Sequence, residues 1–221
     1  MALDKGKIIA IVQFVFSFVA LILSMVALAG GIADNYDNLK SSHWIGQSES
    51  GTLSGSVYGG WLHTCIRFDR SFESRFSSTT CVETEWDGKG AATAMGVLSL
   101  LFASAYLVLV AVKLFNIFAK KVLAKATNKM LNIIECGVGF LGMIFTLACF
   151  AIYAEHNAEH ETKPLDNGYD YGPGFGACVS SFVFELIALV LGGISLLPGM
   201  ATTEVLGAPG GVTTEGAAGH A

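Results

Sequence analysis

The sequence predicts an all-α membrane protein, a four-transmembrane-helix bundle with a small β subdomain in the loop after its first helix. Three observations predict this fold class. Hydrophobic residues make up 52% of the 221 residues and charged residues only 14%, whereas soluble domains average about 25% charged residues. Four apolar runs are each longer than the roughly 18–20 residues that a helix needs to cross a bilayer. The segment between the first two runs is rich in the aromatic and β-branched residues that favour strands.

The apolar runs divide the chain into membrane spans and connecting segments. The predicted spans are residues 8–32, 91–118, 131–153 and 175–197, and the other segments are residues 1–7, 33–90, 119–130, 154–174 and 198–221. A cluster of lysines sets the orientation, namely Lys113, Lys120, Lys121, Lys125 and Lys129. Because short cytoplasmic loops carry an excess of Lys and Arg, the segment 119–130 and both termini are predicted to be cytoplasmic. Residues 33–90 and 154–174 are then two extracellular loops, and the Gly/Ala/Thr-rich tail 198–221 is expected to be disordered.

The first apolar run has an alternative interpretation as a secretory signal peptide. Residues 27–29 read Ala-Leu-Ala, a small-residue pattern at which such a peptide could be cleaved. A signal peptide, however, has an apolar core of only about 7–15 residues, and this run extends from Ile8 to Met25 before the candidate site. Its length favours a membrane span, and cleavage would leave only three spans.

The first outer loop is too long and too aromatic for a simple tether, and it predicts a small antiparallel sheet. The segment from Ser56 to Phe68 has the composition of one strand. Gly59 and Gly60 within it indicate either a bulge or a close approach of two backbones. A sheet of this size buries little apolar surface, so a covalent staple is expected.

Two cysteines can supply that staple. Cys65 and Cys81 are the only cysteines predicted to lie outside the membrane, in an oxidising compartment. A disulfide between them would contribute about 3 kcal/mol by limiting the unfolded chain. Two free thiols or a metal-binding pair are the alternatives. Cys136, Cys149 and Cys178 lie within predicted spans and are expected to be small packing residues.

A set of Trp, Gly and Cys residues follows the first span at characteristic spacings. The set is Trp44, Gly59, Gly60, Trp61, Cys65 and Cys81. It resembles the W…GLW…C…C signature of the claudin superfamily, which includes claudins, peripheral myelin and epithelial membrane proteins, and the calcium-channel gamma and AMPA-receptor regulatory subunits. The span layout is similar over the whole chain, and residues 169–172 before the last span resemble the gamma-subunit branch. Gly60 replaces the signature leucine, which indicates a divergent member.

The resemblance implies a fold and two possible functions. It implies a left-handed four-helix bundle on which Trp44, Gly59, Gly60 and Trp61 anchor an antiparallel sheet. The first implied function is at the plasma membrane, in cell–cell junctions, adhesion and a paracellular barrier, through cis and trans association of the protein with itself or relatives. The second is an auxiliary subunit that regulates a larger ion channel or receptor. Acidic residues of the first loop could attract cations: Asp69, Glu73, Glu83, Glu85 and Asp87.

One acidic residue is predicted deep in the membrane. Glu185 lies about ten residues into the last span, at a depth of roughly 15 Å. A carboxyl group at that depth is costly and normally faces the bundle interior. We expect a neutral carboxyl that is hydrogen-bonded to a neighbouring helix, and Ser17 and Ser104 lie at compatible depths. An ion or proton site is the alternative.

A second acidic residue is predicted near the cytoplasmic end of the third span. Glu135 lies about one turn inside this span. We expect its carboxylate to reach interfacial water, Lys129 or Asn132.

No catalytic, cofactor or metal site is expected. Residues 156–160 match the H-x-x-E-H string of one metalloprotease class, but a zinc enzyme needs a third ligand, and none is expected nearby. A weak surface metal or proton-sensing site is the alternative at His156 and His160. Phosphate-binding glycine loops and nucleophile elbows do not occur. The net charge of -5 excludes a basic nucleic-acid surface.

Overall fold

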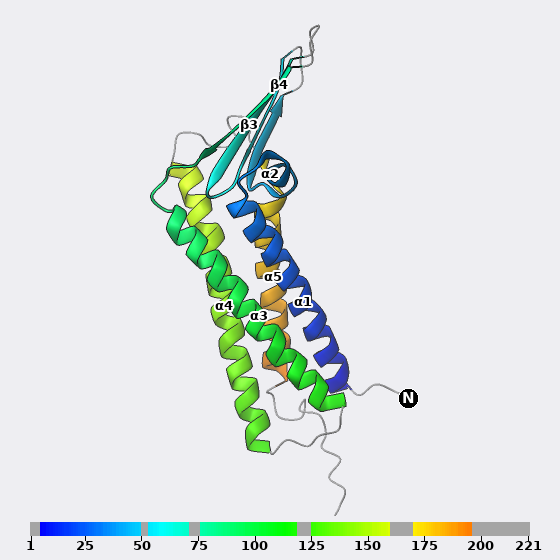
Figure 1. Ribbon diagram of the computed structural model, residues 1–221. Helices are drawn as coiled ribbons and strands as arrows, with labels where there is room; N and C mark the ends of the chain where they lie inside the picture. The colour runs from blue at the N-terminus through cyan, green and yellow to red at the C-terminus, as the bar shows by residue number, and fades with distance from the viewer. Residues whose placement is uncertain (1–4, 50–52, 71–75, 119–124, 160–169, 196–221) are drawn as a thin grey trace, which may run out of the picture.

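The computed structural model describes residues 5–49, 53–70, 76–118, 125–159 and 170–195. Within these residues, four long helices stand side by side and carry a sheet at one end (Figure 1). The helices are α1 (Lys5–Ile32), α2 (Tyr36–Ser42), α3 (Lys89–Phe118), α4 (Lys125–Glu159) and α5 (Pro173–Ile194). The strands are β1 (Ile45–Glu49), β2 (Leu53–Gly59), β3 (His63–Arg70), β4 (Phe76–Glu83) and β5 (Asp170–Tyr171). We call the two ends of the bundle the sheet end and the far end; α1 begins and α5 ends at the far end.

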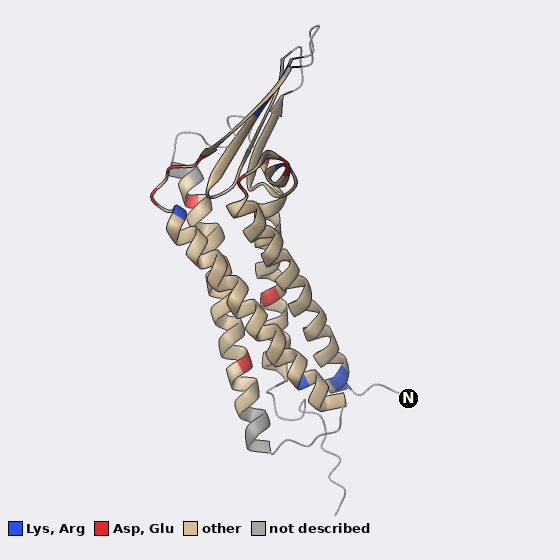
Figure 2. Cartoon of the chain, viewed as in Figure 1, with Lys and Arg blue, Asp and Glu red and all other residues tan. Residues whose placement is uncertain are grey.

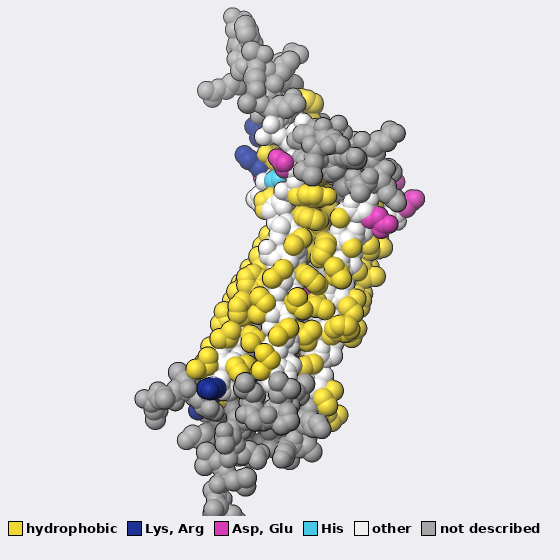
Figure 3. All heavy atoms as spheres, turned by 180° about the vertical axis from the view of Figure 1, so that it is seen from behind, with side chains coloured by type: hydrophobic (Ala, Val, Ile, Leu, Met, Phe, Trp, Pro, Cys, Tyr) yellow, Lys and Arg dark blue, Asp and Glu magenta, His cyan; other side chains and the backbone are white. Residues whose placement is uncertain are grey.

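The four long helices are long and apolar enough to cross a membrane. Their most apolar windows have mean hydropathies between 2.1 and 2.6. Figure 3 shows apolar side chains along the length of one bundle face, and Figure 2 shows most charged residues near the two ends. Apolar side chains face outward along the spans, and charged residues are rare within them. This distribution suits a lipid environment. The chain is therefore a multi-pass membrane protein.

The interior of the bundle is built from small and polar residues at regular spacing. On α1 the buried positions include residues 10, 13, 17, 20, 24 and 27, and on α5 they include residues 174, 178, 181, 185, 188 and 192. The alternating steps of three and four residues are a seven-residue repeat, which produces left-handed supercoiling. Most of these residues are Ala, Ser or Gly, which let helix backbones approach closely in lipid.

The helix boundaries differ slightly from the predicted spans. Helix α1 begins at Lys5, α3 begins at Lys89, and α5 runs from Pro173 to Ile194. Helix α4 starts inside the predicted loop 119–130, and its candidate span is Met130–His156. Helices α1, α3 and α4 extend beyond the apolar runs because polar residues continue a helix once it has formed. Helix α5 instead ends at Ile194, three residues before the predicted end of its span. The predicted tail 198–221 lies outside the described residues.

Two features of the sheet were not predicted. The sheet has the order β4-β3-β2-β1-β5, and every neighbouring pair is antiparallel. Strand β5 comes from the second connection and pairs with β1 through Ile45 and Tyr171. Helix α2 was also missed; the Asn35 side chain caps it by accepting a hydrogen bond from the Asn38 amide. Tyr36 and Leu39 on α2 pack against the sheet.

The prediction of one continuous strand from Ser56 to Phe68 is wrong. The chain turns after Gly59 and forms β2 and β3, which pair with each other. Gly60 explains the turn, because a Cβ atom on it would lie 2.3 Å from the carbonyl oxygen of Gly30 at the end of α1. Of the two interpretations of the glycine pair, the close backbone approach is confirmed.

The predicted disulfide is present. Cys65 and Cys81 are directly opposite each other on β3 and β4 and are bonded. The Cys65 half is buried against α2. Replacing both cysteines with serine is expected to lower the free energy of unfolding by about 3 kcal/mol, because the unfolded chain loses a closed loop. Denaturant unfolding in detergent measures this loss of stability. Mass spectrometry of a non-reduced digest would contradict the pairing if it found both thiols free.

Candidate functional site

Trp44 is the first of three tryptophans that fix the sheet to the bundle. It is fully buried, and its Nε1 donates to the carbonyl oxygen of Ala27 on α1 at 2.8 Å. Its backbone amide donates to Gly59 of β2, and its carbonyl accepts from Gly172 before α5. Trp44 therefore ties the sheet to both the first and the last long helix.

Trp61 continues this anchor at the tip of the β2–β3 hairpin. Its amide donates to Gly31 on α1 at 2.7 Å, and its ring meets the Trp44 ring edge-on at 4.8 Å. Its carbonyl oxygen accepts from Nε1 of Trp86 at 2.9 Å. The expectation that Trp44, Gly59, Gly60 and Trp61 anchor the sheet agrees with these contacts, and Trp86 is a further anchor that the sequence did not single out.

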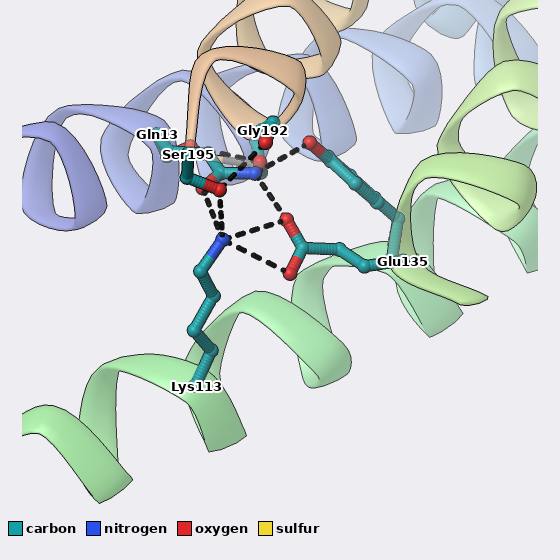
Figure 4. A network of polar contacts seen from close by, with 7 residues as sticks. Gln13, Lys113, Glu135, Gly192 and Ser195 are labelled. Carbon is teal, nitrogen blue, oxygen red and sulfur yellow. Dashed lines mark hydrogen bonds and ion pairs between the residues drawn. The ribbon is translucent and has the colours of Figure 1, made fainter. Parts of the chain in front are cut away.

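A buried ion pair joins the long helices near the far end, and it corrects the expectation for Glu135. Glu135 on α4 is 0% exposed and lies 3.3 Å from the ammonium of Lys113 on α3. Figure 4 shows these two side chains extending toward each other, with Gln13 of α1 and Ser195, the residue that follows α5, completing the group. Lys113 therefore does not belong to the basic inner loop, because it faces the bundle interior.

Hydrogen bonds join the members of this group and leave one carboxylate oxygen of Glu135 without a donor. The three protons of the Lys113 ammonium have three acceptors: Glu135 Oε1 at 3.4 Å, Gln13 Oε1 at 3.4 Å and Ser195 Oγ at 3.0 Å. The Gln13 amide donates to Glu135 and to the Tyr106 hydroxyl. The other carboxylate oxygen, Glu135 Oε2, is buried and makes no hydrogen bond, but it lies 3.3 Å from the Lys113 ammonium. The two side chains form an ion pair, a net-neutral unit that the membrane interior tolerates better than a single charge.

Gln13 and Lys113 were not predicted as partners of Glu135. The sequence could have identified Gln13 as an interior residue, because it belongs to the seven-residue repeat of small residues along α1. A polar side chain on such a stripe faces the other helices. The partner on α3 could not be chosen from spacing alone, since it depends on how the helices are placed against each other.

Glu185 has a different environment, nearer the middle of the bundle. Its two carboxyl oxygens lie 2.9 Å from Thr146 Oγ1 and 3.4 Å from Ser181 Oγ. The expected partners Ser17 and Ser104 instead donate to carbonyls of their own helices. The prediction of a bond to a neighbouring helix is confirmed with Thr146 of α4, and the two serines proposed for it are wrong.

Counting protons around Glu185 favours a neutral carboxyl. The Thr146 hydroxyl lies close to two acceptors, Glu185 and the carbonyl oxygen of Gly142, but it has one proton. Ser181 is placed in the same way between Glu185 and the carbonyl of Ala20. If Thr146 donates to the carbonyl of Gly142 and Ser181 donates to that of Ala20, the hydrogen bond between Thr146 and Glu185 needs a proton on Glu185. A protonated Glu185 supplies three protons for these four contacts, and only the longest, Glu185 to Ser181 at 3.4 Å, has none; an ionised Glu185 would supply one proton fewer.

The same count predicts how substitutions at Glu185 behave. Glu185→Gln keeps a donor and an acceptor, and we expect surface expression close to that of the wild type. Glu185→Leu leaves the hydroxyls of Thr146 and Ser181 with fewer partners, and Glu185→Lys buries a charge, which costs about 2.5–3.5 kcal/mol or more at this depth. Surface biotinylation should rank Gln above Leu and Leu above Lys. Equal surface levels for all three variants would contradict the neutral, hydrogen-bonded carboxyl.

The candidate cation-attracting acids are only partly available. Lys89 Nζ lies 2.8 Å from Glu83 and 3.8 Å from Glu85. The hydrogen bond from Lys89 lowers the pKa of the Glu83 carboxyl. Asp87 is exposed at the start of the turn before α3. Glu73 and the side chain of Asp69 lie outside the described residues.

The residues of the H-x-x-E-H string do not meet as a site within the described part of the chain. His156 stacks on Trp86 at 4.3 Å between ring centres, so it belongs to the anchor of the sheet. His160 lies outside the described residues. Among the residues that the structure describes, no group of three or more His, Cys, Asp and Glu side chains could hold a metal ion.

One face of the sheet carries exposed apolar side chains. Alternation along β3 puts Cys65 on the face that packs against α2 and puts Phe68 on the opposite face. Val82 on β4 shares that opposite face, because its partner in the register is Thr64. Phe68 is 59% exposed and Val82 is 51% exposed. We call this the open face; β4 is an edge strand of the sheet.

Comparison with protein-family models and with curated proteins finds no match.

Proposed function

We propose that this protein connects neighbouring cells through its sheet and organises junctions and a paracellular barrier, as the resemblance to the claudin superfamily implies. The observation that carries the proposal is the open face with Phe68 and Val82, on a sheet that projects beyond the bundle (Figure 1). Val82 pairs with Thr64, four residues from Phe68 along β3, and the half-buried Ile66 lies between them on the same face. Apolar patches on an exposed surface mark interaction sites. The partner is a second copy or a relative, bound in cis or in trans.

Two features of the chain support an extracellular position of the sheet. The Cys65–Cys81 disulfide belongs in an oxidising compartment, and the sheet carries it. Lys5 and Lys7 lie in the first turn of α1 at the far end, and α4 begins at that end with Lys125 and Lys129 in its first two turns. The far end and both termini are therefore proposed to be cytoplasmic, at the plasma membrane.

The rigidity of the anchor supports an adhesive role. Because Trp44, Trp61 and Trp86 fix the sheet through hydrogen bonds to α1 and to each other, little orientational freedom has to be lost when two sheets associate. Exposed acids beside the sheet, such as Asp87, would favour cations over anions along the path between cells.

Cell mixing tests the proposal. We expect the tagged protein, in cells without junction strands, to concentrate only where two expressing cells meet. Replacing Phe68 and Val82 together with serine should reduce this enrichment to the level at contacts with non-expressing cells. Thr79→Ala, at an exposed position on the other face of β4, is the matched control and should behave like the wild type.

The opposite outcome points to the auxiliary role. A uniform surface signal with wild-type protein, together with stoichiometric co-purification of a larger channel or receptor, would contradict adhesion. It would favour a subunit that regulates gating or trafficking of that partner.

A further inference from the structure

The third anchor indole has a donor without a partner. Trp44 and Trp86 donate their indole N–H groups to backbone carbonyls, whereas Trp61 Nε1 is buried and makes no hydrogen bond. The Trp61 side chain is 1% exposed. A buried N–H group that gives up water without a replacement acceptor lowers stability, so most buried donors have one.

A small cavity lies against this ring, in the half of the bundle nearer the sheet. Its walls come from all four long helices and from the β2–β3 hairpin; they include Ser24, Trp61, Ser99, Thr146, Cys149 and Cys178. The space open to the centre of a water molecule is about 10 Å³. This is close to the ~10–15 Å³ that one water molecule requires.

Two of the lining hydroxyls have acceptor capacity left. In the proton count around Glu185, Ser181 donates to Ala20, so Ser24 donates to Ser181 Oγ at 2.7 Å. In the same way Ser99 donates to Thr146 Oγ1 at 2.6 Å. The oxygens of Ser24 and Ser99 then keep their lone pairs, and each hydroxyl oxygen can accept.

We infer that this cavity is a binding site for one water molecule, which accepts from Trp61 Nε1–H and donates to Ser24 and Ser99. The water makes three hydrogen bonds, the usual number for a buried water. It joins the sheet anchor to two hydroxyl pairs, Ser24–Ser181 and Ser99–Thr146. In the proton count the Ser99–Thr146 pair continues by a hydrogen bond to Glu185, so the water links the tip of the β2–β3 hairpin to the buried carboxyl through that pair.

The three tryptophans allow a direct test by nuclear magnetic resonance. Protein labelled with ¹⁵N in the indole groups and placed in lipid nanodiscs should give three indole signals. In a rotating-frame experiment we expect a cross-peak between water and the Trp61 indole proton, with the sign of a dipolar contact and not of proton exchange. We expect no such cross-peak for Trp44 or Trp86. Trp61→Phe assigns the signal; if that variant does not fold, Trp44→Phe and Trp86→Phe assign it by elimination.

Substitution of the two acceptors completes the test. Ser24→Ala with Ser99→Ala should move the Trp61 signal and remove its water cross-peak. Ser104→Ala is the matched control, because this hydroxyl bonds its own helix at Leu100 and does not line the cavity. Absence of the cross-peak in the wild type would overturn the water site, and persistence of an unchanged cross-peak in the double variant would overturn the assignment of its acceptors.

Discussion

Glu135→Ala is expected to lower the free energy of unfolding by about 3–5 kcal/mol, because it leaves the Lys113 ammonium buried without its counter-charge. The Lys113 side chain is only 12% exposed, so water cannot replace the carboxylate without a change in the bundle. Lys113→Ala should cost a similar amount for the reverse reason. Unfolding by denaturant in mixed micelles, followed by near-ultraviolet circular dichroism, measures both.

A double substitution separates the charge effect from simple loss of packing. Lys113→Met together with Glu135→Met removes both charges and retains side-chain volume. Replacing a buried ion pair with apolar residues is often neutral or stabilising, so we expect the double variant to recover most of the lost stability. A double variant as unstable as either single variant would show that the ion pair is not the reason for the loss.

Trp44→Ala is expected to lower the free energy of unfolding by about 3–5 kcal/mol, the range for removing a buried large aromatic side chain. The substitution removes edge-on ring contacts with Trp61 and Tyr153 at 4.8 and 5.0 Å and the hydrogen bond to Ala27. Because this indole ties the sheet to α1, limited proteolysis should cut the sheet of the variant before it cuts the bundle.

Two comparison variants make this result specific. Trp44→Phe retains a ring but loses the donor to Ala27, and it should cost about 1–3 kcal/mol. Phe115→Ala removes an aromatic side chain that is 65% exposed on α3, and it should change stability by no more than about 0.5 kcal/mol. Equal losses for Trp44→Ala and Phe115→Ala would contradict the anchoring role of Trp44.

These expectations bear on the proposed function through geometry. The proposed adhesive surface is held in position on the bundle by the hydrogen bonds of Trp44 and Trp61 to α1. Loss of contact enrichment in Trp44→Ala cells, with surface expression retained, would connect the anchor to adhesion. The open-face variants at Phe68 and Val82 should lose enrichment without losing stability.

The sequence alone determined the number of long helices, the position of the sheet and the staple within it. Apolar runs identify spans because a bilayer requires about 20 consecutive apolar residues whatever the neighbouring helices do. Cys65 and Cys81 could be paired from their shared location in the chain. The spans, the sheet segment and the cysteine pair depend on local composition and segment length, and both can be read directly from the amino-acid sequence.

Only the tertiary structure decided which groups meet. The partner of Glu135 is Lys113, 22 residues away, and the partner of Glu185 is Thr146, 39 residues away. Strand β5 joins the sheet from the second connection, and Gly60 turns the chain where it meets the end of α1. Such pairings depend on how helices pack and rotate against one another, and the energy of a buried polar group depends on the partner it finds there.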